Sequence, residues 1–137
     1  MKHKIRRVDY FYVSVKDEPG QSLEVLTQMA GQGVNMLAFA AIPTGLHTTQ
    51  LTLFPEDSLQ LESVVKRAGM TLVGPKGAFL VQGADEIGAL VGVHERLYRA
   101  KVNIYSSTCV TDGQGCYGYI IYVRPEKYEE AAAALGL

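Results

Sequence analysis

Alternating apolar and other side chains near the start of the chain predict a β-strand. Phe11, Val13 and Val15 share one face of the segment 10–15. The opposite face carries Tyr10, Tyr12 and Ser14. A period of two residues is typical of a strand that is buried on one side.

The period changes to a helical one directly after Pro19 and Gly20. Apolar side chains at helical spacing predict a helix over 21–32, ended by Gly31 or Gly33. The apolar positions are Leu23, Leu26, Met29 and Ala30. The same reasoning predicts strands over 34–41, 47–54 and 70–73, with a second helix over 56–68.

The second half of the chain repeats the first. Val34-Asn35-Met36 returns as Val102-Asn103-Ile104 at an offset of 68 residues (102 − 34 = 68). The same offset pairs Phe11 with Phe79, Val13 with Val81, Asp17 with Asp85 and Gly20 with Gly88. In the later hairpin the offset grows to 70, which pairs Leu51 with Ile121, Leu53 with Val123 and Pro55 with Pro125 and predicts two inserted residues. The repeat indicates one supersecondary unit present twice.

The predicted fold class is α+β, with two ferredoxin-like βαββαβ repeats, each an antiparallel sheet with helices on one face. The first domain spans 1–75 and includes a basic N-terminal extension, and the second spans 76–137. The elements of the second repeat are expected at 78–82, 87–100, 102–110, 116–124 and 126–135, so this repeat lacks its last strand. Either the sheet edge stays short, or the N-terminal extension or another subunit covers it.

Composition and charge narrow the classes of protein. The chain has 137 residues, of which 47% are hydrophobic and 20% charged, and its net charge is −1, so it lacks a basic stripe for nucleic acid. The basic start, residues 1–7, is predicted to be a solvated tail. No run of 18 apolar residues and no signal core occurs, which predicts a cytoplasmic protein without a membrane partner.

Some of the strand residues point away from the predicted helices. In the second repeat this outer face is expected to carry Asn103, Tyr105, Ser107, Cys109, Cys116, Gly118, Ile120 and Tyr122, and it also collects Tyr10, Tyr12 and Leu80. Such a face predicts contact with another sheet or subunit. The alternative is a solvated face of residues with high β-propensity.

Two motifs stand out at the ends of the predicted elements: Asp17-Glu18-Pro19-Gly20, between the first strand and first helix, and Gly33-Val34-Asn35-Met36, at the start of the second strand. Together they resemble the ACT domain, a βαββαβ module that binds amino acids and regulates metabolic enzymes. The resemblance covers essentially the whole chain as two copies. The second copy departs from it, because Asp85-Glu86-Ile87-Gly88 lacks the proline and Lys101 replaces the glycine before Val102.

The resemblance implies an amino-acid site around these motifs. The implied residues are Asp17, Glu18, Pro19, Gly20, Gln21, Ser22, Asn35 and Met36, with Asp85, Gly88, Asn103 and Ile104 in the second copy. A helix N-terminus can receive a carboxylate. We expect Asp17 to cap the helix or accept an ammonium group, and Asn35, on the neighbouring strand, to read an amino-acid backbone. The alternative is an ordinary helix start without a ligand.

The remaining chemistry in the sequence is sparse. His3, His47 and His94 lie on three different elements, which predicts no metal site, and no phosphate-binding or dinucleotide motif indicates a cofactor. If Asp112-Gly113 forms a two-residue turn, Cys109 faces Cys116 across the hairpin. A redox pair is then conceivable, but a cytosolic location favours two reduced packing residues.

Three functions from different classes follow. The first is a non-catalytic sensor that binds an amino acid between ACT-like units of a homodimer, formed through the outer sheet face or the strand edges, and acts by allosteric regulation. The second is an oligomerisation or docking module for a partner metabolic enzyme. The third, a small acylphosphatase-like enzyme, is disfavoured because Asp17 and Glu18 repel an anionic phosphoryl group.

Overall fold

The structure of the protein is a computed structural model that describes residues 3–137, except for the side chain of Ala68. Contacts divide these residues into two compact units. The first comprises residues 9–76, and the second combines residues 3–8 with residues 77–137. We call them the N-terminal unit and the C-terminal unit.

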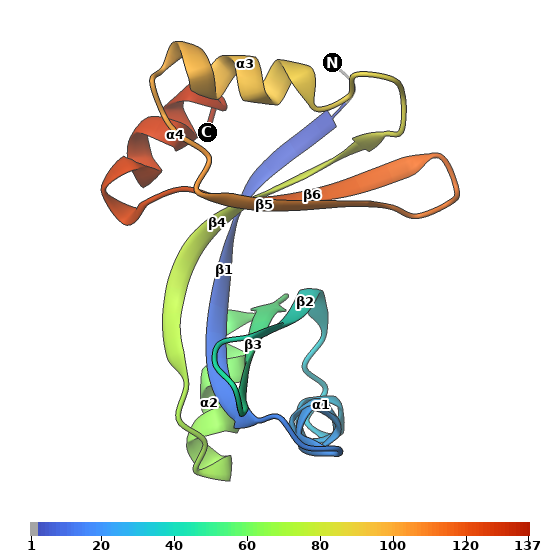
Figure 1. The fold of residues 1–137 in the computed structure, drawn as a ribbon, viewed down its shortest axis with the longest axis vertical. Coiled ribbons are helices and arrows are strands. Elements are labelled where there is room, and N and C mark those ends of the chain that lie inside the picture. Colours follow the sequence, from blue (N-terminus) through green and yellow to red (C-terminus); the bar gives the residue numbers. More distant parts are fainter. Residues whose placement is uncertain (1–2) are drawn as a thin grey trace. The chain divides into compact units, whose positions relative to one another are not determined.

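Two long strands contribute residues to both units. They are β1 (His3–Lys16) and β4 (Val73–Ala84), which are hydrogen-bonded neighbours in the strand order β2-β3-β1-β4-β6-β5 (Figure 1). The two strands expected at 70–73 and 78–82 are therefore one strand, β4. The contact-based division also differs from the predicted ranges 1–75 and 76–137, because residues 3–8 and Lys76 change sides.

The N-terminal unit contains β2 (Met36–Pro43), β3 (Thr48–Pro55) and the helices α1 (Gln21–Gly31) and α2 (Ser58–Ala68). One buried cluster forms its core. The strand residues Phe11, Val13, Leu51 and Leu53 pack there with Val25 and Met29 of α1 and Leu61, Val64 and Val65 of α2. Because side chains from both helices meet the same set of strand residues, both helices cover one face of these strands.

The C-terminal unit contains α3 (Val91–Arg99), β5 (Ser106–Thr111), β6 (Cys116–Tyr122), a short 3₁₀ turn η1 (Pro125–Lys127) and α4 (Tyr128–Ala134). Its separate core includes Phe79 and Val81 of β4, Val93 and Leu97 of α3, and Ala131 and Ala132 of α4. The helix expected over 87–100 starts later, because residues 87–90 form turns.

The N-terminal extension is part of a strand, and the prediction of a solvated tail is wrong for residues 3–7. Ile5 packs against the core of the C-terminal unit, and Val8 is buried. The strand was not predicted because its apolar residues are interspersed with lysine and arginine. Arginine side chains can still belong to such a strand, since their aliphatic stems lie along apolar surface while their charged ends reach water. The sequence left three alternatives for the sheet edge where the second repeat lacks its last strand: a short edge, cover by the N-terminal extension, or cover by another subunit. In the structure the N-terminal extension provides the missing strand. Lys2 lies outside the described residues.

The later hairpin keeps the offset of 68, and the predicted change to 70 is wrong. Phe11 pairs with Leu53 and Phe79 pairs with Ile121, so Leu53 corresponds to Ile121 rather than to Val123. Both hairpins also close alike, since the N–H of Thr44 donates to Thr48 O and the N–H of Asp112 donates to Cys116 O. No residues are inserted within the hairpin.

This register separates the two cysteines. Cys109 lies opposite Tyr119, while Cys116 pairs with Ala84 on the other neighbouring strand, so the predicted Cys109–Cys116 pair is wrong. The physical reason is the loop. Asp112 Oδ1 accepts hydrogen bonds from the N–H groups of Gln114 (2.7 Å) and Cys116 (3.0 Å), which produces a longer turn than the two-residue turn assumed.

The corrected register also changes which residues lie on the outer face of the sheet. Residues directly opposite each other in a ladder share a face. Ser107 and Cys109 lie opposite the buried Ile121 and Tyr119 and therefore belong to the helix-facing side, whereas Asn103 and Tyr105 precede β5. Leu80 does lie on the predicted outer face, opposite Ile120, and it is 5% exposed.

Candidate functional site

The loop between β1 and α1 is held at the end of the sheet. The backbone N–H of Asp17 donates to His47 O at 2.9 Å, which ties the loop to the residue before β3. Gly20 then turns the chain into the helix with a φ of 91°, in the left-handed region that favours glycine. Residues 17–20 are exposed, and Gln21 and Ser22 are half-buried.

No side chain caps α1, so the expectation that Asp17 caps this helix is wrong. Gly20 occupies the N-cap position, and glycine has no side chain that could accept a hydrogen bond. The start of α2 differs, because Asp57 Oδ1 accepts from the N–H of Gln60 at 3.2 Å. The N–H of Gln21 donates to Glu18 O at 3.4 Å, and the first turn of α1 presents its remaining free N–H groups to solvent or to a bound anion.

The loop between β4 and α3 resembles the first loop but lacks the proline, and its helix starts two residues later in the repeat, at Val91 rather than at the position equivalent to Gln21. The N–H of Asp85 donates to Gly115 O at 2.9 Å, and Gly88 has a φ of 75°. The N-cap of α3, Leu90, also provides no side-chain hydrogen bond. The two loops thus share the hydrogen bond of the aspartate N–H and a left-handed glycine at the same repeat position, although Gly20 is the N-cap of its helix and Gly88 lies two residues before the N-cap.

Asp17 and Asn35 lie at opposite ends of β3. Lys16 pairs with Thr48, and Met36 pairs with Pro55. Seven residue steps along β3 correspond to about 23 Å. The expectation that Asn35 starts the neighbouring strand is also wrong, since β3 lies between β1 and β2. One unit by itself does not bring these two residues together.

Asn35 already has a partner in the N-terminal unit. Its Nδ2 donates to Glu56 Oε2 at 2.7 Å, and the N–H of Glu56 donates to Asn35 O at 2.8 Å. Sequence reasoning did not connect these residues, because Asn35 precedes β2 and Glu56 follows β3. The corrected offset places Arg124 where the first unit has Glu56, so the repeat carried no signal for the pair.

The other predicted site residues have diverse environments. Met36 and Ile104 are partly buried and pack against the cores of their own units. Asn103, Asp85 and Gly88 are exposed.

The histidines do not gather into a site. His94 Nε2 lies 2.6 Å from Tyr119 Oη, and the two rings stack. Within residues 3–137, no group of three or more histidine, cysteine, aspartate or glutamate side chains is placed to hold a metal ion. No helix in the same part of the chain is long and apolar enough to span a membrane.

Two side chains of the hairpin next to the second loop have raised pKa values. Burial raises the pKa of the Cys109 thiol, and the negative charge of Asp85 raises it further. Burial also raises the pKa of Tyr117, with smaller contributions from Cys109 and Glu86. A raised pKa keeps the thiol protonated at neutral pH, which makes it a poor nucleophile.

No protein-family model and no curated protein matches the sequence. Solved structures do match the fold. A protein from Bacteroides thetaiotaomicron superposes with a TM-score of 0.81 at 15% identity, over 96% of this chain and 88% of that chain.

Two similar structures are regulatory subunits of aspartate kinase. The subunit from Thermus thermophilus, in a ligand-free form, has a TM-score of 0.67 at 13% identity, over 99% of this chain and 95% of that one. The subunit from Thermus flavus has a TM-score of 0.61 at 14% identity, with the same coverage of 99% and 95%. At identities this low the likeness concerns the fold. The chain has the ACT-like fold of these regulatory subunits, as the motifs around Gly20 and Asn35 predicted.

Proposed function

We propose that this is a non-catalytic regulatory protein of two tandem ACT-like repeats, and that its ligand is an amino acid. The observation that carries the proposal is the geometry shared by the two β–α loops. Each has a left-handed glycine, Gly20 or Gly88, before a helix N-terminus that no side chain caps. Such an N-terminus favours the carboxylate of an amino acid.

The carboxylates beside these loops suit the other end of the ligand. Asp17 and Glu18 in the first loop, and Asp85 and Glu86 in the second, are exposed and available for an ammonium group. The same charges disfavour a phosphoryl substrate, which argues against an acylphosphatase-like enzyme.

A complete site requires an interface between units. Because Asp17 and Asn35 lie at opposite ends of β3, a ligand that contacts both must bridge one unit and another. We propose a homodimer as the source of that interface, formed through strand edges, with ordering of the loops as the allosteric signal. Fold neighbours described as regulatory subunits of a kinase support a regulatory role of this kind.

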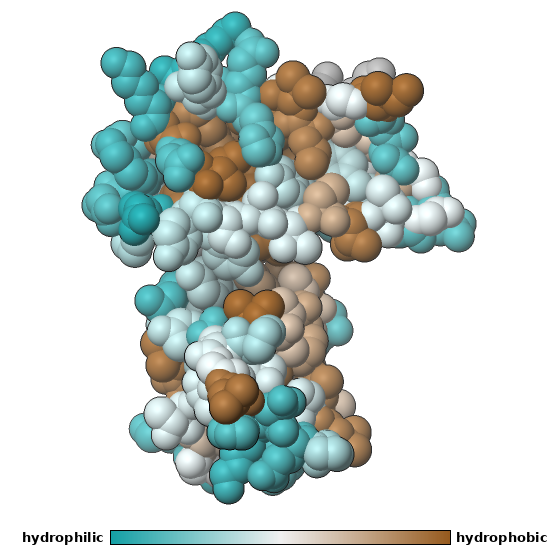
Figure 2. Space-filling view, viewed as in Figure 1, coloured by the Kyte–Doolittle hydropathy of each residue, from teal (hydrophilic) through white to brown (hydrophobic). Residues whose placement is uncertain are grey.

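The alternative is a docking module whose pocket binds nothing. Apolar residues reach the molecular surface in several places (Figure 2). Leu46 is 86% exposed, and Ile87 is fully exposed. These side chains favour contact with a partner enzyme as the competing explanation.

The test is a thermal-shift panel of the twenty amino acids on the full chain. A ligand at 100 times its Kd stabilises by about 2.7 kcal/mol, or roughly 10 °C for a chain of this size. We expect Asp17→Asn and Asp85→Asn to reduce the shift, and Glu62→Gln, on the exposed side of α2, to leave it unchanged. A flat panel favours the docking module. Gly20 is a poor probe, because its φ of 91° would strain any other residue.

A further inference from the structure

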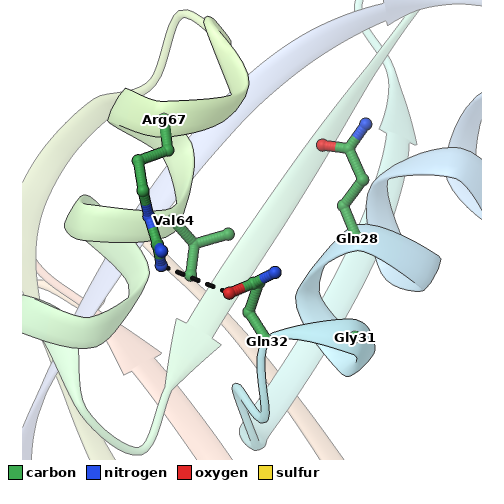
Figure 3. Close-up of a pocket in the computed structure, with 5 residues that line it drawn as sticks. All are labelled: Gln28, Gly31, Gln32, Val64 and Arg67. Atoms are coloured by element: carbon green, nitrogen blue, oxygen red, sulfur yellow. Dashed lines mark hydrogen bonds between the residues drawn. The ribbon is translucent and has the colours of Figure 1, made fainter.

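Residues near the C-terminal ends of α1 and α2 line an open pocket of about 330 Å³ in the N-terminal unit, which we call the cavity (Figure 3). It is lined by Gln28, Gly31, Gln32, Val64 and Arg67. None of these residues belongs to the candidate loops. Since α1 begins at Gln21 and ends at Gly31, its 11 residues separate the cavity from the β1–α1 loop by about 16 Å.

Arg67 presents an incompletely used guanidinium group to this cavity. Its Nη2 donates to Gln32 Oε1 at 3.2 Å, and its Nε donates to Ser63 O at 3.4 Å. A guanidinium has five N–H donors, so three remain. Among the ion pairs of residues 3–137, Arg67 takes part in none. The side chain is therefore oriented by neutral acceptors and retains a free positive charge for a carboxylate.

On the α1 side of the cavity, Gln28 offers an acceptor that needs a hydrogen-bond donor. Its Oε1 is buried and accepts no hydrogen bond from the described residues. A buried acceptor without a donor costs free energy, and such groups in native proteins call for a partner. The last turn of α1 itself contains no basic residue that could donate to this acceptor. This side of the cavity favours an ammonium group or another N–H donor.

We propose that this cavity binds the zwitterion of an α-amino acid. The carboxylate pairs with Arg67, the ammonium group donates to Gln28 Oε1, and Val64 contacts the apolar part of the ligand. The proposal shares only the ligand class with the proposed function, and it places a site away from both β–α loops.

Binding here connects the two helices of the N-terminal unit. Besides Arg67, Gln60 forms hydrogen bonds from α2 to the segment after α1, since its Nε2 donates to Gln32 O (3.2 Å) and Gly33 O (3.4 Å). That segment leads directly into Asn35, which is hydrogen-bonded to Glu56 before α2. A ligand that contacts both Gln28 and Arg67 would therefore link α1 to α2 and stabilise the segment between α1 and Asn35.

The experiment is calorimetric titration and ¹⁵N-NMR mapping of the full chain with the twenty amino acids, using acetate and methylammonium as single-charge probes. We expect at least one amino acid to bind and to shift the amide signals of residues 28–33 and 64–69. Acetate and methylammonium should bind at least 10-fold more weakly, because each satisfies only one side of the cavity.

Three variants decide the assignment. Arg67→Gln should weaken binding at least 10-fold, and Gln28→Leu several-fold. Lys66→Gln, which removes the same charge one position away and does not line the cavity, should bind like the wild type. Unchanged melting temperatures confirm that each variant is folded, and Arg67→Lys replaces Arg67→Gln if that variant is not.

The outcomes separate this proposal from the proposed function. Shifts confined to the loops, with binding lost in Asp17→Asn but retained in Arg67→Gln, overturn the cavity site and leave the proposed function standing. Absence of binding by all twenty amino acids overturns both. Equal affinity for acetate and the amino acid overturns the zwitterion and reduces the site to a simple anion site.

Discussion

Lys101 has the same left-handed backbone conformation as Gly33, with φ values of 59° and 73°. The two residues are equivalent in the repeat, and their surroundings match. The N–H of Val34 donates to Met29 O, and the N–H of Val102 donates to Leu97 O. The departure from the ACT-like motif at Lys101 is therefore a change of residue without a change of backbone.

Replacing Lys101 with glycine should stabilise the protein. A non-glycine residue in the left-handed region costs about 1–2 kcal/mol, of which the greater freedom of glycine in the unfolded chain offsets about 0.5–1 kcal/mol. We expect Lys101→Gly to raise the free energy of unfolding in urea by up to about 1 kcal/mol. Gly33→Ala should lower it, since its Cβ meets only ordinary contacts and strain alone acts. A destabilised Lys101→Gly would contradict this account.

Gly77 is required by the packing of Tyr128 in the C-terminal unit. A Cβ at Gly77 would lie 2.6 Å from the Tyr128 ring, which stacks on Phe79. Gly77→Ala should lower the free energy of unfolding by about 1–3 kcal/mol through overpacking. Gly92→Ala is the matched control, because nothing lies near its Cβ within α3, and it should stabilise by about 0.5–1 kcal/mol. Denaturant unfolding of both variants measures the contrast.

Arg7 attaches the N-terminal strand to α4. Its Nη1 and Nη2 donate to the two carboxylate oxygens of Glu129 at 2.8 and 2.9 Å. These hydrogen bonds lower the pKa of Glu129, and the charge of Arg7 lowers it further. Because the pKa is lower in the folded state, the stabilisation is present above the unfolded-state pKa of about 4.3 and is lost as the pH falls through the folded-state value.

Glu129→Gln should therefore unfold at lower urea concentration than the wild type at pH 7. The difference between the two midpoints should shrink between pH 5 and pH 3. Glu62→Gln, an exposed substitution on α2, should show neither effect. A difference between Glu129→Gln and wild type that is independent of pH would assign the effect to packing rather than to the ion pair.

The strand edges are the surfaces predicted to form the dimer. β2 and β5 stand at the two ends of the strand order, and they carry the equivalent residues Ile42 and Val110, which are 50% and 69% exposed. A charged lysine blocks edge pairing. Ile42→Lys or Val110→Lys should convert a dimer to a monomer in sedimentation experiments. A dimer retained in the double variant would move the interface to another surface.

Much of the fold followed from local patterns. The period of two from Phe11 to Val15 and the helical period after Gly20 are properties of neighbouring residues, so the strand and helix could be predicted. The repeat of Val-Asn at positions 34 and 102 extended this reasoning to the second half. Both β–α loops could be located in the same way, because each needs a glycine in the left-handed region at its end.

The failures concern contacts between residues that are distant in the chain. From the sequence, Ile5 and Arg7 belong to a predicted solvated tail. In the structure, Ile5 packs against the core of the C-terminal unit and Arg7 is hydrogen-bonded to Glu129 of α4. The register that separates Cys109 from Cys116 depends on the hydrogen bonds of Asp112, and the partner of Asn35 lies beyond the next strand. A sequence by itself determines local conformation, through sterics and hydrophobic period. Only the tertiary structure decided which strand completes a sheet, which residues oppose each other, and that Gln28 and Arg67 line one cavity, because these relationships arise from packing between elements.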